Sequence, residues 1–369
     1  MKLTHSRMQS FKSCRRRHWY EYEIGLRKEV DAKALRMGSA GHDALDLLKQ
    51  GKTIEEAITK LVEIYQYCPD NVDRYDWDIE YTTVETLVIG WDWRWQESGL
   101  KVLETEQAFE IPLVNPATGK PSRLWKHAGK IDGIIDVDDR LMVFEHKFIS
   151  DDIDQNSDYW RRLQLDSQVS LYVHAARKLG HDVESVLYDC IRKPTIKPNA
   201  IPLLDDNKMK IVLDEAGERV FNKVKAKKSC NICGGASEED GAPDCLCRIG
   251  KPRQTGDKER GWVLQSRPMT PDEWSKKLLD DIVARPEFYY ARNEIARLDS
   301  DINEVLREMW EIQKTMREAQ QSDSWYRTVN FNTCTYCSFF GICSSKLEAG
   351  EVPEGFNILE NVHPELGSE

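Results

Sequence analysis

Two neighbouring segments rich in isoleucine and valine, residues 128–137 and 141–148, constrain the fold of this chain more than any other feature of its sequence. Only the Asp-Asp-Arg segment at 138–140 separates them, which is typical of two antiparallel strands joined by a tight turn. Because both segments are largely apolar, we expect buried strands rather than a surface hairpin.

The segments around this hairpin predict the rest of the core. Residues 102–113 and 183–191 also have the pattern of strands, and residues 159–179 have the pattern of a helix that ends at Gly180. Three further helices are predicted before the core, at residues 38–51, 53–67 and 80–98. Helices and strands in this order predict an α/β protein with a mixed sheet flanked by helices.

The segment that follows the core is predicted to be mainly helical. A long helical region begins at Pro271, and apolar residues recur in it in steps of three and four from Ile295 to Met316. We interpret this stripe as core packing in preference to a dimer seam. The acidic segment from Leu347 onward is predicted to be a frayed tail.

The overall composition narrows the class of protein. The 369 residues carry a net charge of −11, which excludes a protein that coats polyanions non-specifically. The longest apolar run is far shorter than the roughly 18 residues of a membrane span, and no apolar stretch follows the first charges of the chain. We therefore expect a cytoplasmic protein without membrane contact, whose nucleic-acid contacts, if any, come from basic patches such as residues 15–18 and 223–228.

Charged residues interrupt the two buried strands. Asp132 lies in the first strand, and Glu145 and Lys147 lie in the second. Because side chains alternate along a strand, Glu145 and Lys147 share one face while His146 points away, and Asp132 can lie beside Glu145. Two carboxylates close together predict a site for Mg²⁺ or Mn²⁺, and the lysine can stabilise charge on a phosphate. The alternative is a charged hairpin at the surface, against which the apolar neighbours argue.

Residues outside the hairpin extend this site. His42 follows Gly38-Ser39-Ala40-Gly41 at the start of a predicted helix, where a neutral imidazole can ligate a metal. A lone helical histidine is more often structural, but together with the hairpin we favour a ligand. Gln168 and Tyr172 are four residues apart on the helix after the hairpin and therefore share a face.

These residues together resemble the RecB-like branch of the PD-(D/E)XK nuclease superfamily, which includes the AddB nuclease domain, CRISPR-adaptation exonucleases and phage recombination exonucleases. The resemblance covers roughly residues 1–195 and 285–345, although Ile131 rather than proline precedes the aspartate. It implies a restriction-endonuclease-like core with catalytic Asp132, Glu145, Lys147, Gln168 and Tyr172. It also implies Mg²⁺ or Mn²⁺ bound by His42, Asp132, Glu145 and the backbone carbonyl of His146.

Composition and the resemblance together divide the chain into five regions. They are a helical region with one cysteine and the motif histidine (1–100), the nuclease core (101–195), a cysteine-containing insertion (196–265), a helical region that closes the nuclease domain (266–346) and the acidic tail (347–369).

The cysteines form two sets, and the absence of an export signal favours metal binding over disulfides. Three lie close together at positions 334, 337 and 343, and Cys14 is the candidate for a fourth ligand. Four thiolates alone fit Zn²⁺ or iron–sulfur equally; the resemblance implies a [4Fe–4S] cluster held by Cys14, Cys334, Cys337 and Cys343. Such a cluster would place the basic residues Arg15, Arg16 and Arg17 beside a DNA path.

The second set of cysteines lies in the insertion, at Cys230, Cys233, Cys245 and Cys247. The segment is rich in glycine and has little apolar content on which to fold. It is predicted either to bind a structural Zn²⁺ or to be a loop.

The function that the residues and the resemblance together favour is a metal-dependent DNA exonuclease acting on single strands or DNA ends. The resemblance alone implies that its setting is recombination or repair of phage type. The chain has no Gly-x-x-x-x-Gly-Lys-[Ser/Thr] motif, so a separate helicase or single-strand annealing protein is the expected partner. The alternatives are a non-catalytic, metal-stapled subunit that binds DNA ends in a repair or adaptation complex, and a restriction-type endonuclease. The sequence does not specify an oligomeric state.

Overall fold

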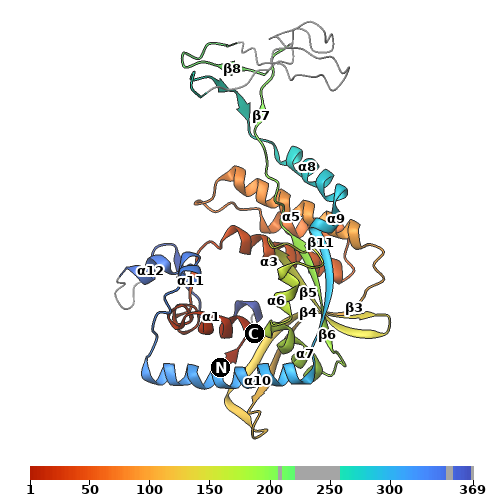
Figure 1. The fold of residues 1–369 in the computed structure, drawn as a ribbon, viewed down its shortest axis with the longest axis vertical. Helices are drawn as coiled ribbons and strands as arrows, with labels where there is room; N and C mark the ends of the chain where they lie inside the picture. Colours follow the sequence, from red (N-terminus) through yellow and green to blue (C-terminus); the bar gives the residue numbers. More distant parts are fainter. Residues whose placement is uncertain (207–209, 221–257, 346–351, 367–369) are drawn as a thin grey trace. The chain divides into compact units, whose positions relative to one another are not determined.

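The computed structural model describes residues 1–206, 210–220, 258–345 and 352–366. The chain divides into two compact units, one formed by Met1–Pro194 with Lys277–Glu369 and the other by Thr195–Lys276. Figure 1 shows the elements of both units. Within the described part of the chain, no helix has the length and apolar character that crossing a bilayer requires.

The first unit is built on a six-stranded sheet. The strand order is β1-β4-β5-β6-β11. The long strand β4 pairs with β1 near its start and with β5 near its end, and β3 pairs with β4 along most of its length. The β5–β6 and β1–β4 pairs are parallel and the remaining pairs are antiparallel, which confirms the predicted mixed sheet. The strands are β1 (Lys2–Leu3), β3 (Lys101–Val114), β4 (Pro121–Val137), β5 (Arg140–Ile149), β6 (Ser185–Arg192) and β11 (Tyr290–Ala296).

The predicted hairpin is formed by β4 and β5. The ladder closes at the pair Val137 and Arg140, which leaves Asp138 and Asp139 as a two-residue turn. Their φ angles of 53° and 61° are those of a turn whose twist matches the strands, and aspartate tolerates this left-handed conformation better than most residues.

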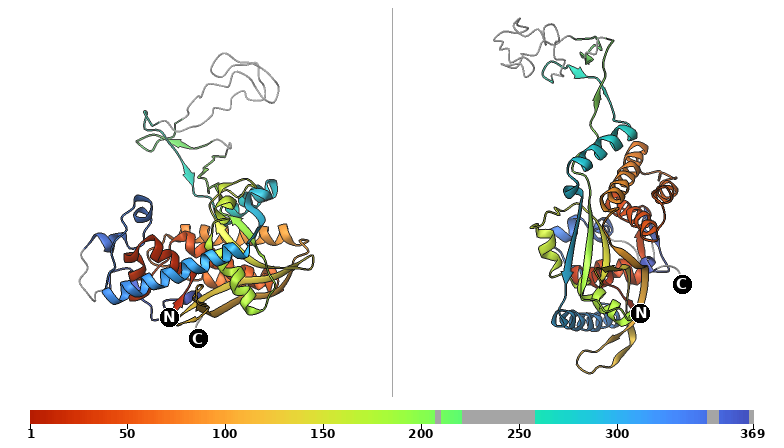
Figure 2. Two further views of the ribbon diagram at one scale, coloured as in Figure 1. Left: turned by 60° about the horizontal axis from the view of Figure 1, so that its bottom comes forward. Right: turned by 90° about the vertical axis from the view of Figure 1, so that its right-hand side faces the viewer.

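Helices cover both faces of the sheet (Figure 2). Apolar residues of α6, α7 and α10 pack on the face that carries Val143, and α3 and α5 contact the face that carries His146 and Phe148. Gly41 of α3 is required there, because a Cβ atom at this position would overlap the ring of Phe148. The helices of eight or more residues are α1 (His5–Ser13), α3 (Lys33–Lys49), α4 (Ile54–Ile64), α5 (Arg74–Trp95), α7 (Ser167–Leu179), α8 (Pro271–Ala284) and α10 (Asp299–Ser322). The shorter ones are α2 (Arg15–His18), α6 (Asp158–Leu163), α9 (Pro286–Tyr289), α11 (Phe331–Thr335) and α12 (Phe340–Ser344), with a π-helix at Trp19–Ile24 and a 3₁₀ turn at Pro364–Leu366.

The single helix predicted over residues 159–179 is wrong, because two helices occupy this segment. Asp166 is the N-cap of α7, because its side chain accepts a hydrogen bond from the backbone N–H of Gln168, so a new helix begins there. The buried guanidinium of Arg297 donates to the carbonyls of Leu163 and Asp166 on either side of the gap between α6 and α7. A contact from more than 100 residues away therefore stabilises the break.

The long helix predicted from Pro271 is also interrupted, because Ile295 lies on the edge strand β11 and not on a helix. The rest of the stripe lies on α10, where Ile302, Met309 and Met316 are buried in the core. The stripe is thus core packing, as predicted.

The frayed tail predicted from residue 347 is wrong over residues 352–366. Strand β12 (Phe356–Ile358) pairs antiparallel with β2 (Leu26–Lys28), and Arg27 donates to the carbonyl of Val362. His363 of the same segment is buried. The acidic composition of this segment therefore misled the prediction, since its few apolar residues suffice to pair it with the N-terminal region.

The second unit has short ladders. Strand β7 (Ile201–Pro202) pairs with β10 (Ser266–Arg267), and β8 (Val212–Leu213) pairs with β9 (Val263–Leu264). The cysteines proposed to bind zinc and the basic patch at 223–228 lie outside the described residues.

Candidate active site

Asp132 and Glu145 lie where the ladder between β4 and β5 ends. Its last pair is Gly133 and Phe144, so the next opposed positions are those of the two carboxylates. Beyond this point the backbone N–H of His146 donates to Asp132 Oδ2 at 2.9 Å. A side-chain carboxylate thus replaces the neighbouring strand as the partner, and the two strands separate around the acids.

Lys147 shares a face with Glu145, as strand alternation predicts. Its Nζ lies 2.5 Å from Glu145 Oε1, while Glu145 is only 2% exposed. Glu145 Oε2 is also buried and has no hydrogen-bond partner among the described residues. A buried carboxylate oxygen without a partner is unfavourable unless a further positive group binds to it.

His42 reaches the same carboxylates from α3. Its Nδ1 lies 3.5 Å from Asp132 Oδ2. Burial lowers the pKa of His42 to about 4, although the charge of Asp132 opposes this effect. The imidazole is therefore neutral near pH 7, which is the form that can bind a metal.

Gln168 and Tyr172 approach from the first turns of α7. Gln168 Nε2 donates to the hydroxyl of Tyr172 at 2.9 Å and lies 3.5 Å from Glu145 Oε1. These two residues and the four groups above line one cavity of about 220 Å³ (His42, Asp132, Glu145, Lys147, Gln168 and Tyr172). The structure thus brings together the six side chains that the sequence singles out, from α3, β4, β5 and α7.

The electrostatics of the cavity separate the two carboxyl groups. Burial, followed by the charge of Asp132, raises the pKa of Glu145 to about 8. Burial opposes ionisation of Asp132 as well, but His42, His146 and Lys147 together hold its pKa below the usual range. Burial would lower the pKa of Lys147, but Glu145 and Asp132 raise it, so its ammonium group stays charged.

The donor set fits a hard divalent cation. It offers two carboxylates, one with an unpartnered oxygen, and a neutral imidazole. Across the residues that the structure describes, no three histidine, cysteine or acidic side chains already converge as ligands of one ion. Ligation by the backbone carbonyl of His146 stays a prediction.

Lys49 is a member of the site that sequence reasoning missed. Its side chain is 2% exposed, and its Nζ donates to the backbone carbonyl of Asp132 at 2.7 Å. Lys49 lies seven residues after His42 on α3, so both share one helical face, and this spacing was the available signal. It acts as a positioning residue, because it holds the backbone of a carboxylate rather than facing the cavity.

The four cysteines at the two ends of the chain also lie around one cavity, of about 200 Å³. Cys14 lies between α1 and α2, and α11 and α12 carry Cys334 and Cys343 (Figure 1). All four, Cys14, Cys334, Cys337 and Cys343, are free thiols. They too lack, within the described ranges, the arrangement of three ligands around one ion.

The three arginines after Cys14 are engaged in contacts within the protein. Arg15 lies over the ring of Tyr326, with 4.5 Å between the guanidinium carbon and the ring centroid. Arg16 Nε donates to the carbonyl of Trp325 at 2.7 Å, and Arg17 Nε lies 2.9 Å from Glu21 Oε1. The contacts of Arg15 and Arg16 hold the N-terminal helices against residues 325–326, and that of Arg17 is a local pair, so all three arginines have a structural role.

The protonation of Glu145 makes metal binding depend on pH. Because its pKa is raised to about 8 from an ordinary value of 4.5, a cation that binds below pH 8 must displace its proton. We expect the Mn²⁺ affinity of the wild-type protein, measured by calorimetry, to rise up to about tenfold per pH unit between about pH 6 and 8. His42, with a pKa of about 4, does not titrate in this range.

The control for this prediction is Glu145→Gln, which removes the titrating group and is expected to remove the dependence. In the metal-free wild type, the folded protein keeps a proton that the unfolded chain has lost, so the free energy of unfolding falls as the pH rises from about 4.5 to 8. A Mn²⁺ affinity that stays constant over this range would show that metal binding displaces no proton from Glu145.

Comparison with known proteins gives one clear result. A sequence model of the PD-(D/E)XK nuclease superfamily matches residues 2–344, nearly the whole chain. No curated protein matches the sequence.

Proposed function

The chain belongs to the PD-(D/E)XK nuclease superfamily, whose members use divalent metals such as Mg²⁺ or Mn²⁺, and on this premise we propose that it is a DNA exonuclease that acts on single strands or ends. The observation that carries the proposal is the single cavity that His42, Asp132, Glu145 and Lys147 share. Carboxylates and an imidazole for a cation, next to an ammonium group for a phosphate, are the groups that phosphodiester hydrolysis needs.

The proposed mechanism assigns a role to each side chain. His42, Asp132 and Glu145 would hold Mg²⁺ or Mn²⁺, which supplies a Lewis acid for the scissile phosphate and lowers the pKa of an attacking water. Lys147, once Glu145 ligates the cation, would be free to donate to a phosphate oxygen and to stabilise the charge that develops there. Gln168 and Tyr172 hold each other and are placed to orient the phosphate or the lysine.

A surface near the cysteine cavity supports the preference for single strands. Four aromatic rings between residues 326 and 340 are unusually exposed: Tyr326 (53%), Phe331 (83%), Tyr336 (87%) and Phe340 (56%). Exposed rings beside arginines form the kind of surface on which unpaired bases stack. The setting that we propose is phage-type recombination or repair in the cytoplasm, with a helicase or a single-strand annealing protein that supplies the strand.

Linear and circular substrates test this function. With Mn²⁺, the purified protein is expected to degrade linear single-stranded DNA and to leave circular single-stranded DNA intact, and a chelator should abolish degradation. Cleavage of the circle would reveal an endonuclease instead. DNA binding that survives chelation without any product would favour the non-catalytic end-binding subunit.

We also propose that the four thiols around the cysteine cavity hold a [4Fe–4S] cluster. Four cysteines that line one cavity are the number and type of ligand that such a cluster takes, and the cluster would join the two ends of the first unit. This role explains why Cys14 and the three C-terminal cysteines, distant in sequence, line one space.

The cluster predicts a spectroscopic change on substitution. Cys14→Ser is expected to lower the iron content and the visible absorbance near roughly 400 nm of anaerobically purified protein, and to lower its thermal stability. The matched control is Cys68→Ser, since Cys68 is a half-buried free thiol whose contacts are the local carbonyls of Pro69 and Val72. One equivalent of zinc that Cys14→Ser removes, without iron, or a colourless wild type, would exclude iron–sulfur.

A further inference from the structure

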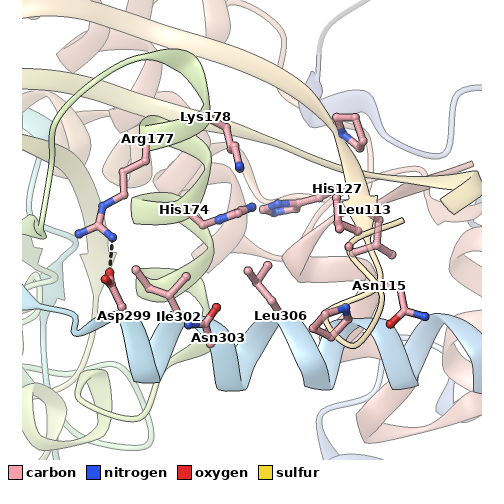
Figure 3. A pocket seen from close by; sticks show the side chains of 14 residues that line it. Leu113, Asn115, His127, His174, Arg177, Lys178, Asp299, Ile302, Asn303 and Leu306 are labelled. Carbon is pink, nitrogen blue, oxygen red and sulfur yellow. Dashed lines mark hydrogen bonds and ion pairs between the residues drawn. The ribbon is translucent and has the colours of Figure 1, made fainter. Parts of the chain in front are cut away.

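Besides the active-site cavity and the cysteine cavity, the first unit has a cavity of about 530 Å³. Figure 3 shows the side chains that line it. It lies between the ends of β3 and β4, the C-terminal half of α7 and the first turns of α10. Its volume falls within the roughly 300–1,000 Å³ that is typical of pockets for small molecules. His127 lines both this cavity and the active-site cavity, so the two spaces meet at this residue.

His127 has an unmet capacity for hydrogen bonding. The residue is 2% exposed, and its Nδ1 is buried without a hydrogen-bond partner among the described residues. Figure 3 shows His127 of β4 and His174 of α7 pointing toward each other, with their rings nearly parallel and 6.2 Å apart. Burial lowers the pKa of His127 to about 3 and that of His174 to about 4, so both rings are neutral near pH 7. A ligand that accepts or donates a hydrogen bond here would satisfy a group that the protein leaves unpaired.

The charges around this cavity favour an anion. His174, Arg177 and Lys178 follow one another at helical spacing on α7, and Lys178 extends over the cavity in Figure 3. Asp299, the one acidic residue among the described residues that line the cavity, is held by Arg177 at 2.7 Å. Because this pair neutralises itself, the ammonium group of Lys178 provides the net charge of the lining.

The opposite side of the cavity is apolar. Ile302 and Leu306 of α10 form its floor in Figure 3, and Leu113 adds to it from the end of β3. Asn303 lies between the two α10 residues and offers an amide group beside this floor. A cationic rim above an apolar floor suits a ligand that has a phosphate at one end and a planar, weakly polar ring at the other.

We propose that this cavity binds a nucleoside monophosphate. Its phosphate would lie near Lys178, His174 and His127, and its base would pack on the apolar residues of α10. The identity of the ligand rests on the proposed function, since exonucleolytic hydrolysis releases nucleotides one cavity away. The cavity holds one nucleotide beside the catalytic groups and does not itself contain them, so the ligand is a released product and not the strand being cut.

Calorimetric titration of the full-length protein with 2′-deoxyadenosine 5′-monophosphate, in the presence of a chelator, tests the proposal without any cleavage. Lys178→Ala and His174→Ala are expected to weaken binding roughly tenfold or more, because each removes a hydrogen bond to a charged group. Lys314→Ala is the matched control, since Lys314 lies on α10, is half exposed and pairs with Glu311 away from the cavity. Lys178 is exposed, so its substitution is not expected to affect folding.

Three outcomes would overturn the proposal. The first is that the nucleotide does not bind. The second is that Lys178→Ala and His174→Ala both leave its affinity unchanged while Lys147→Ala abolishes binding. The third is that deoxyadenosine or inorganic phosphate competes as strongly as the nucleotide itself. Because the titration uses no metal, a protein without nuclease activity still gives a readable result. Failure of the proposed nuclease function is thus distinguishable from failure of this site.

Discussion

Replacing Lys147 with alanine is expected to lower the rate of DNA cleavage about 10²- to 10³-fold, while the protein remains folded. The ammonium group lies 2.5 Å from Glu145 Oε1 at the wall of the catalytic cavity, and no other lysine among the described residues approaches that oxygen as closely. It is therefore the cation best placed to stabilise charge on the scissile phosphate. The measurement is the single-turnover rate with Mn²⁺ on linear single-stranded DNA.

The control for this prediction is Lys126→Ala. Lys126 lies on β4 of the same sheet, its side chain is 60% exposed, and it pairs with Glu110 rather than with any residue of the cavity. Its substitution is expected to leave the rate near that of the wild type. If Lys147→Ala cleaves DNA as fast as Lys126→Ala, the lysine has no role in the chemical step, although the fold and the family would stand.

The central part of the site could be predicted because short-range rules govern it. Alternation along β5 determines that Glu145 and Lys147 share a face, and the two-residue turn determines that Asp132 is opposite Glu145. Helical periodicity likewise places Gln168 and Tyr172 together on α7. Each of these relations depends on a few neighbouring residues, so the sequence contains the information directly.

The features that could not be predicted depend on contacts between distant segments. The edge strand β11 has the polar run Arg292-Asn293-Glu294 at its centre and forms because β6 offers an unpaired edge. The break between α6 and α7 depends on Arg297, and the order of residues 352–366 depends on β2. Lys49 likewise becomes part of the site only when α3 packs against β4. No local pattern reports such contacts.

Behind the catalytic face, a buried carboxylate joins three elements. Asp189 of β6 is fully buried, and it accepts a hydrogen bond from Trp91 Nε1 at 2.6 Å and one from Arg292 Nε at 3.1 Å. His146 Nδ1 lies 3.0 Å from Asp189 Oδ2, the same oxygen that accepts the hydrogen bond from Trp91. Because the backbone of His146 donates to Asp132, this network supports the strand segment that carries Glu145, one of the two proposed catalytic acids.

The charge of Asp189 has a specific partner. Burial disfavours its ionisation, but Arg292 and His146 hold its pKa below the usual range, so the carboxylate is charged at neutral pH. Arg292 is itself only 12% exposed and lies over the ring of Trp95, with 4.0 Å between the guanidinium carbon and the ring centroid. The guanidinium therefore has little access to water that could replace the carboxylate.

Asp189→Ala is accordingly expected to lower the free energy of unfolding by about 3–5 kcal/mol, because it leaves the buried charge of Arg292 uncompensated. Urea denaturation of the metal-free protein measures the change. Asp151→Ala is the matched control: Asp151 also pairs with an arginine, Arg162, but the two side chains are 52% and 66% exposed, and the loss is expected to stay below about 1 kcal/mol. Equal effects of the two substitutions would contradict the structural role of Asp189. The double variant with Arg292→Leu should recover part of the loss, since removing both charges from a buried pair costs less than removing one.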